Sequence, residues 1–112
     1  YSSAASDVYK RQRQMQALAE RHKDDWGDER IRGVLNQAAR ELLLLESSDW
    51  PFLVTTGQAR QYAIQRFSQH LERFLELTNS VERGEPDGIL AAQLWEKDRL
   101  FPNIDYRWWC GE

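Results

Sequence analysis

The segment ELLLLESSDWPF, residues Glu41–Phe52, carries the pattern on which the fold prediction depends. Four consecutive leucines end a stretch of helical periodicity, and a short polar and aromatic sequence that contains Trp50 and Pro51 follows them. A proline disfavours helical geometry in the residue before it, so the helix is predicted to end before Trp50. The leucines therefore indicate a buried helix. The residues after them indicate a loop that either plugs the end of a bundle or presents Trp50 to a ligand.

The helix that leads into this segment is predicted over residues 29–46, with Asp28 as its N-terminal cap. Apolar residues at steps of three and four form the stripe expected of a core-facing helix: Ile31, Leu35, Ala38, Leu42 and Leu45. Leu43 and Leu44 widen this stripe, so the helix is expected to be covered on more than one side.

The same periodicity predicts three further helices, over residues 13–24, 57–81 and 89–97. The long helix over residues 57–81 carries a stripe of Ala59, Ala63, Phe67, His70, Phe74 and Leu77, broadened by Tyr62, Ile64, Leu71 and Leu75. The tail after Pro102 is expected to be extended or irregular. The predicted fold is all-α and bundle-like, with three long antiparallel helices, a short fourth and an irregular C-terminal tail.

Residues 2–12, SSAASDVYKRQ, match the translation of an adapter used in transposon-based sequencing libraries. We therefore expect residues 1–12 to be an adapter scar and disordered, and the native sequence to begin near Arg13. Residues 13–108 are predicted to form the helical domain, and residues 109–112 an uncertain tail.

Composition narrows the range of function classes. The chain of 112 residues has a net charge of −3, which gives no basic excess for binding nucleic acid. Two histidines and a single cysteine, Cys110, are scattered along it, so we expect no metal site, no cofactor and no disulfide. The lone cysteine suits a reducing, cytoplasmic compartment. No apolar run approaches the length of a membrane span.

Asp49, Trp50 and Phe52 are the candidate binding residues. In one interpretation, Trp50 plugs the bundle and Asp49 bonds backbone N–H groups, as aspartate does in turns. In the other, a proline-stiffened loop holds out Trp50 and Phe52 as a platform for an apolar or sugar face. His70 lies on an apolar stripe and is expected to be a buried, hydrogen-bonded core histidine, because no nucleophile is paired with it by spacing.

Two longer stretches, LNQAARELLLLESSDWPFLVTTGQARQYAIQRFSQHLERFLEL (Leu35–Leu77) and LWEKDRLFPNIDYR (Leu94–Arg107), resemble the C-terminal helical domain of 1,4-α-glucan branching enzymes of glycoside hydrolase family 57. The most specific piece is SSDWPF, Ser47–Phe52, which is similar to the last signature segment of that family. The sequence departs from the family in its bulky LLLLESS, and its end, WWCGE, has no counterpart.

The resemblance implies an incomplete (β/α)₇ catalytic barrel upstream of this chain. There, a glutamate attacks the anomeric carbon and an aspartate is the acid–base, with retention of configuration. Neither carboxylate matches a position here, so the fragment alone is expected to be inactive. The resemblance also implies that the domain helps to wall the α-glucan cleft, with Trp50 against the sugar face and Asp49 orienting the loop or bonding a hydroxyl. The alternatives are a hydrolase of the same family, or a free-standing helical module that binds a protein through Trp50, Trp95 and Trp108.

Overall fold

The computed structural model of the chain describes residues 2–47 and 57–111. Within these ranges the molecule is all-α, as predicted, and its elements are α1 (Ser2–Arg21), α2 (Glu29–Ser47), α3 (Gly57–Glu82), α4 (Gly88–Lys97) and a 3₁₀ helix, η2 (Tyr106–Trp109). None of these described helices is long and apolar enough to cross a membrane.

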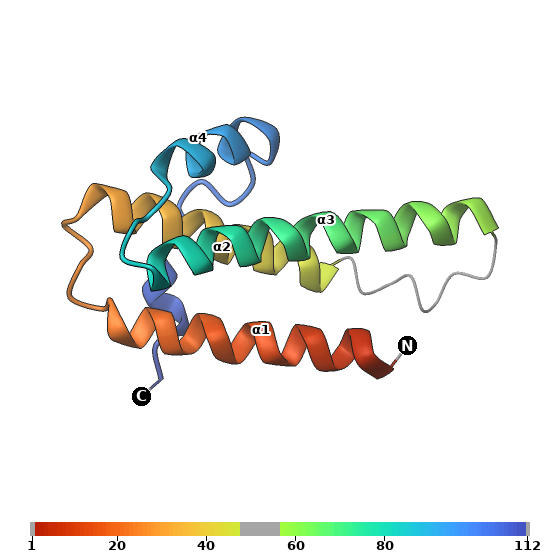
Figure 1. The fold of residues 1–112 in the computed structure, drawn as a ribbon, viewed down its shortest axis with the longest axis horizontal. Coiled ribbons are helices and arrows are strands. Elements are labelled where there is room, and N and C mark those ends of the chain that lie inside the picture. Colours follow the sequence, from red (N-terminus) through yellow and green to blue (C-terminus); the bar gives the residue numbers. More distant parts are fainter. Residues whose placement is uncertain (1, 48–56, 112) are drawn as a thin grey trace.

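Helix α2 lies at the centre of the molecule, and each of the other elements packs against it. The three long helices run alternately back and forth, while α4 lies on the opposite side of the α2–α3 pair from α1 (Figure 1). Because it is covered from several sides, α2 buries most of its length, including Leu35, Ala38, Leu42 and Leu45 at 0% exposure. The predicted stripe and the predicted covering on more than one side are both confirmed.

The helix ends follow from local chemistry. The side chain of Asp28 accepts hydrogen bonds from the backbone N–H groups of Arg30 and Ile31, which confirms the predicted cap of α2. Asp87 does the same for α4 by accepting from the backbone N–H of Leu90. Between α3 and α4, Gly84 adopts a positive φ of 78°, a geometry that a residue without a Cβ adopts at little cost.

The first helix differs from the prediction, which placed disorder over residues 1–12 and the start of the helix at residue 13. In the structure α1 begins at Ser2, and Val8 is partly buried against the core. Once a helix has formed, each further residue adds a hydrogen bond without a new nucleation cost, so the segment continues the helix that Met15, Leu18 and Ala19 anchor. The adapter origin of these residues stays a prediction.

The tail after Pro102 is irregular, as expected, apart from the single 3₁₀ turn η2. This turn forms where the Asp105 side chain accepts a hydrogen bond from the backbone N–H of Arg107. Tyr106 is fully buried, and its hydroxyl donates to the carbonyl of His22 at 2.6 Å. Trp109 packs against the core while Trp108 is 64% exposed. The tail thereby ties α1 to α2.

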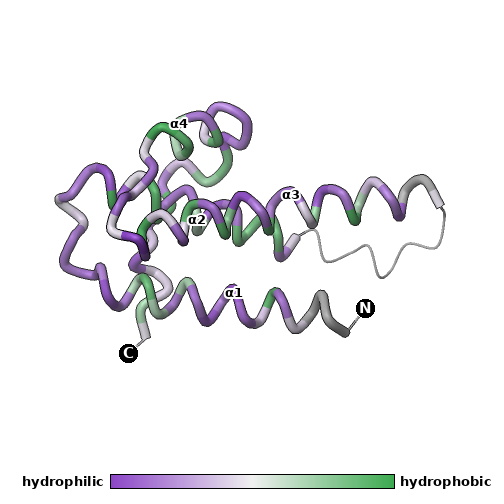
Figure 2. Tube along the Cα trace, in the orientation of Figure 1, coloured by the Kyte–Doolittle hydropathy of each residue, from purple (hydrophilic) through white to green (hydrophobic). Residues whose placement is uncertain are grey.

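Apolar positions recur along α2, α3 and α4, whereas α1 is mainly hydrophilic (Figure 2). The stability of the domain should therefore depend on α2 more than on any surface of α1.

Replacing Leu42 by Ala should test this dependence. The side chain is completely buried, so its loss should lower the free energy of unfolding by about 2–5 kcal/mol through lost burial and a residual cavity. Urea denaturation followed by far-ultraviolet circular dichroism measures the change. Leu43→Ala is the matched control. Because Leu43 is only partly buried, this substitution should lower the free energy of unfolding clearly less than Leu42→Ala does. Equal losses for the two variants would contradict a core centred on the Leu42 face.

Candidate functional site

The predicted binding residues Asp49, Trp50 and Phe52 lie outside the described residues. The structure describes the two helices that hold this segment, α2 up to Ser47 and α3 from Gly57. Leu42 and Leu45 near the end of α2 and Phe67 of α3 belong to one core cluster. The candidate segment is therefore joined at both ends to helices that a common apolar core fixes relative to each other.

Tyr62 and Ile64 add exposed apolar surface on α3 close to this segment in sequence. The prediction placed both in the core stripe, but they are 60% and 44% exposed. Both residues flank Ala63, which is 0% exposed, so α3 does bury a face at this level, but that face is narrower than the predicted stripe. The N-terminal part of α3 extends beyond the end of α2 (Figure 1). Sequence periodicity does not give the width of the face that neighbouring elements cover.

A cluster of buried charged side chains joins the middle of the bundle. Glu41 of α2 and His70 of α3 are 0% and 1% exposed, and Nδ1 of His70 lies 2.8 Å from Oε1 of Glu41. The other carboxylate oxygen of Glu41 accepts a hydrogen bond from Nε2 of Gln37 at 2.9 Å. The prediction that His70 is a buried, hydrogen-bonded core histidine is confirmed.

Asp98, at the C-terminal end of α4, completes this cluster. Arg73 of α3 donates to Oδ2 of Asp98 at 3.0 Å, which ties the end of α4 to α3. Burial raises the pKa of Glu41 above its ordinary value, and the neighbouring Asp98 adds to this effect, while the hydrogen bond from His70 opposes it. The carboxyl groups of Glu41 and Asp98 thus lie close together in the core, an arrangement that favours the neutral form of one of them.

The same cluster has donors that could bind a metal. One ligand atom each of Glu41, His70 and Asp98 lies within 4.8 Å of the others. Carboxylate and imidazole are typical zinc ligands, so the residue types fit. However, Asp98 is already bonded to Arg73 and Glu41 to Gln37, so a metal ion would have to displace these partners and join a cluster that Arg73 supplies with positive charge. The arrangement is best suited to holding α2, α3 and α4 together.

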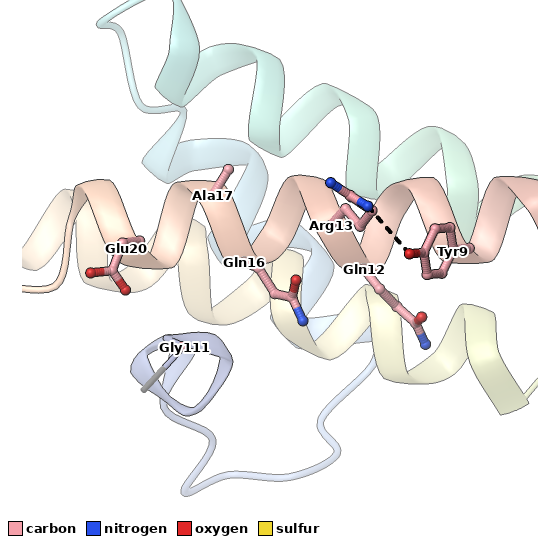
Figure 3. Close-up of a pocket in the computed structure, with 7 residues that line it drawn as sticks. All are labelled: Tyr9, Gln12, Arg13, Gln16, Ala17, Glu20 and Gly111. Carbon is pink, nitrogen blue, oxygen red and sulfur yellow. Dashed lines mark hydrogen bonds between the residues drawn. The ribbon is translucent and has the colours of Figure 1, made fainter.

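A hollow of about 650 Å³ lies along the outer side of α1 (Figure 3). Its lining consists of α1 side chains and Gly111, and Arg13 donates to the hydroxyl of Tyr9 at 3.2 Å within it. None of the described residues that line it is a buried charged group, and its one hydrogen bond, from Arg13 to Tyr9, is exposed, so these residues give no support for catalysis there.

Comparison with known proteins gives a consistent family. Residues 7–109 match the family of 1,4-α-glucan branching enzyme C-terminal domains. A 1,4-α-glucan branching enzyme of Thermococcus kodakarensis is 42% identical over 98 residues, which cover 84% of this chain and 14% of that enzyme. A probable 1,4-α-glucan branching enzyme of Mycobacterium tuberculosis is 37% identical over 76 residues, covering 66% of this chain and 14% of the relative.

Among solved structures, the α-amylase AmyC from Thermotoga maritima has a similar fold, with a TM-score of 0.87 and 30% sequence identity. The match covers 100% of this chain and 21% of the AmyC chain. The chain thus spans about one seventh of the length of the curated relatives that it matches, given their 14% coverage, and about a fifth of AmyC.

The raised pKa of Glu41 predicts how stability changes with pH. A raised pKa in the folded state adds stability that is complete below the unfolded value of about 4.3, and this stability is lost as the pH rises through the folded value. We therefore expect the free energy of unfolding of the wild type, relative to Glu41→Gln, to fall as the pH rises from about 4 toward neutrality. Urea denaturation over this pH series measures it, and a difference that stays constant with pH would contradict the assignment.

Proposed function

The chain belongs to the family of 1,4-α-glucan branching enzyme C-terminal domains, and we propose that it serves as the helical C-terminal part of such an enzyme. The observation that carries the proposal is the match over residues 7–109, supported by 42% identity to the Thermococcus enzyme. The reaction proposed for the whole enzyme is a retaining glycosyl transfer, in which a 6-hydroxyl of a glucan chain accepts the unit in place of water.

The catalytic groups of this reaction are assigned to a barrel that precedes the present chain in the full polypeptide. No residue described here pairs a nucleophile with an acid–base in an open site; the Glu41, His70 and Asp98 cluster is buried. We therefore propose that the domain contributes to substrate binding and that the chain alone is inactive.

Asp49, Trp50 and Phe52 are the residues proposed to contact the glucan. An aromatic ring at the end of a rigid helix pair can lie against a sugar face with little loss of conformational freedom. Trp50 would hold the acceptor chain and keep water away from the glycosyl-enzyme, and Asp49 would orient the segment or bond a sugar hydroxyl. The exposed side chains of Tyr62 and Ile64 offer apolar surface that could extend this platform.

A second candidate function is hydrolysis of an α-glucan, as in an amylase. The similarity to AmyC favours it, because a protein named as an α-amylase shares this fold over the entire chain. A free-standing interaction module is less well supported, since each of these relatives carries the domain as a small part of a longer chain. Membership of glycoside hydrolase family 57, a role in glycogen synthesis and a cytoplasmic location follow from the same proposal.

The products that the full-length protein forms from amylose distinguish the two reactions. We expect new α-1,6 linkages, which proton NMR and chain-length analysis after debranching detect. Release of reducing ends without α-1,6 linkages would assign the hydrolase function instead.

Replacing Trp50 by Ala in the full-length protein should lower branching relative to hydrolysis. Loss of about 1.4 kcal/mol of acceptor binding in the transition state corresponds to roughly a tenfold fall in the ratio of the two rates. Trp108→Ala is the matched control, because this tryptophan is 64% exposed, lies in η2 and is not among the residues proposed to contact the glucan. An unchanged ratio in Trp50→Ala would remove Trp50 from the acceptor site.

A further inference from the structure

The turn that follows α4 exposes two large apolar side chains although its ends are buried. Leu100 and Phe101 are 49% and 47% exposed, whereas Asp98 and Ile104 on either side of them are 9% and 3% exposed. Asp98 is bonded to Arg73, and the backbone N–H of Ile104 donates to the carbonyl of Phe101 at 3.0 Å. The turn is therefore fixed at both ends, and its exposed residues are not part of a fraying terminus.

A buried arginine holds the same turn in place. Arg40 of α2 is only 5% exposed and donates to the carbonyls of both Leu100 and Phe101. Its guanidinium also lies 4.4 Å from the centre of the Trp95 ring, a cation–π contact. Burying a cation is unfavourable unless its hydrogen bonds are complete. The buried guanidinium of Arg40 therefore requires the carbonyls of this turn and fixes the position of the turn.

Phe101 has a φ of 52°, in the left-handed region. For a bulky residue this is unfavourable, and such conformations persist where the surrounding structure enforces them, often at binding sites. Phe101 gains little burial within this domain in return, since about half of its side chain stays exposed. The conformation and the exposure together leave the ring available for a contact outside the domain.

Beside the turn, a groove of about 390 Å³ lies between α2 and α4, and Trp95 and Pro102 contribute to its lining. Gly33, in the interior of α2, also lines it, and a Cβ added there would meet nothing within 4 Å. Glycine weakens a helix interior relative to alanine, and packing within the domain does not require it here. A glycine at this place suits the close approach of a further polypeptide.

The lengths of the relatives favour one occupant for this surface. The chain covers 14% of the Thermococcus enzyme and 21% of AmyC, and the matched family is a C-terminal part, so most of such a protein lies outside this structure. We propose that Leu100, Phe101 and the adjoining groove form the surface on which the preceding part of the same polypeptide docks. The proposal rests on the chain being part of a longer enzyme, but not on which reaction that enzyme performs.

Hydroxyl-radical footprinting of the full-length protein tests the docking. Trypsin cleaves after Arg99 and Arg107, so Leu100 and Phe101 fall in a single peptide in which tandem mass spectrometry locates oxidation. The oxidation rate of each residue in the native protein is divided by its rate in the urea-unfolded protein. Docking predicts that this ratio is far below the value expected for side chains that are half exposed. Trp108 provides a comparison within the same chain.

Phe101→Gly in the full-length protein separates docking from folding. Glycine accepts the positive φ without strain, so the turn should keep its conformation while the ring is lost. Truncation of a central interface residue should speed proteolytic release of the C-terminal fragment by roughly fivefold or more. Hydrogen exchange of the α4 amides should stay unchanged, and a loss of protection in α4 would show that the ring supports the fold instead.

Other occupants give different results and would overturn the proposal. Protection that needs added maltoheptaose would assign the surface to a glucan, and protection that grows with protein concentration would assign it to a second copy. Full oxidation of Phe101 under all conditions would show a free surface. The product assay on the same sample is independent, because a protein without branching activity can still protect Phe101.

Discussion

The burial of two neighbouring ionisable side chains on α2, Arg40 and Glu41, is the constraint on which the rest of the structure depends. A buried charge is tolerable only when its hydrogen bonds are complete, so both residues require partners from other elements. Glu41 finds one in His70 of α3, and Arg40 finds carbonyls in the turn after α4. Apolar packing holds the helices together, but these polar bonds specify the register of α2, α3 and α4, since sliding α3 or α4 along α2 would break one of them.

This constraint acts on the described residues at two places in the domain. The segment between α2 and α3 is anchored by helices whose relative position the Glu41–His70 bond fixes. The turn at Leu100 and Phe101 is anchored by Arg40. One surface is proposed to bind sugar and the other to bind protein. Both therefore depend on adjacent residues of a single helix.

Sequence reasoning could predict what periodicity and caps encode. The extents of α2, α3 and α4 agree with the structure to within a residue or two, and the environment of His70 is confirmed. The sequence-based prediction missed the burial of Arg40 and Glu41, because a core stripe is assigned from apolar residues and charged residues are assumed to be exposed. It also placed Tyr62 in the core and did not foresee the burial of Tyr106, because neither the width of a covered helix face nor the partner of Tyr106 can be read from local sequence. The candidate residues Asp49, Trp50 and Phe52 remain predictions outside the described ranges.

The hydrogen bond from Tyr106 to the carbonyl of His22 joins residues far apart in the chain. Gln14 of α1 likewise reaches Thr78 of α3. Because such contacts close long loops, they form late and slow the final step of folding. During synthesis, α2, α3 and α4 can assemble as they emerge, but α1 gains its bond from the tail only after Tyr106 has been made. Among the helices described here, the first in the chain is thus among the last to reach its final place, and until then its apolar face stays uncovered.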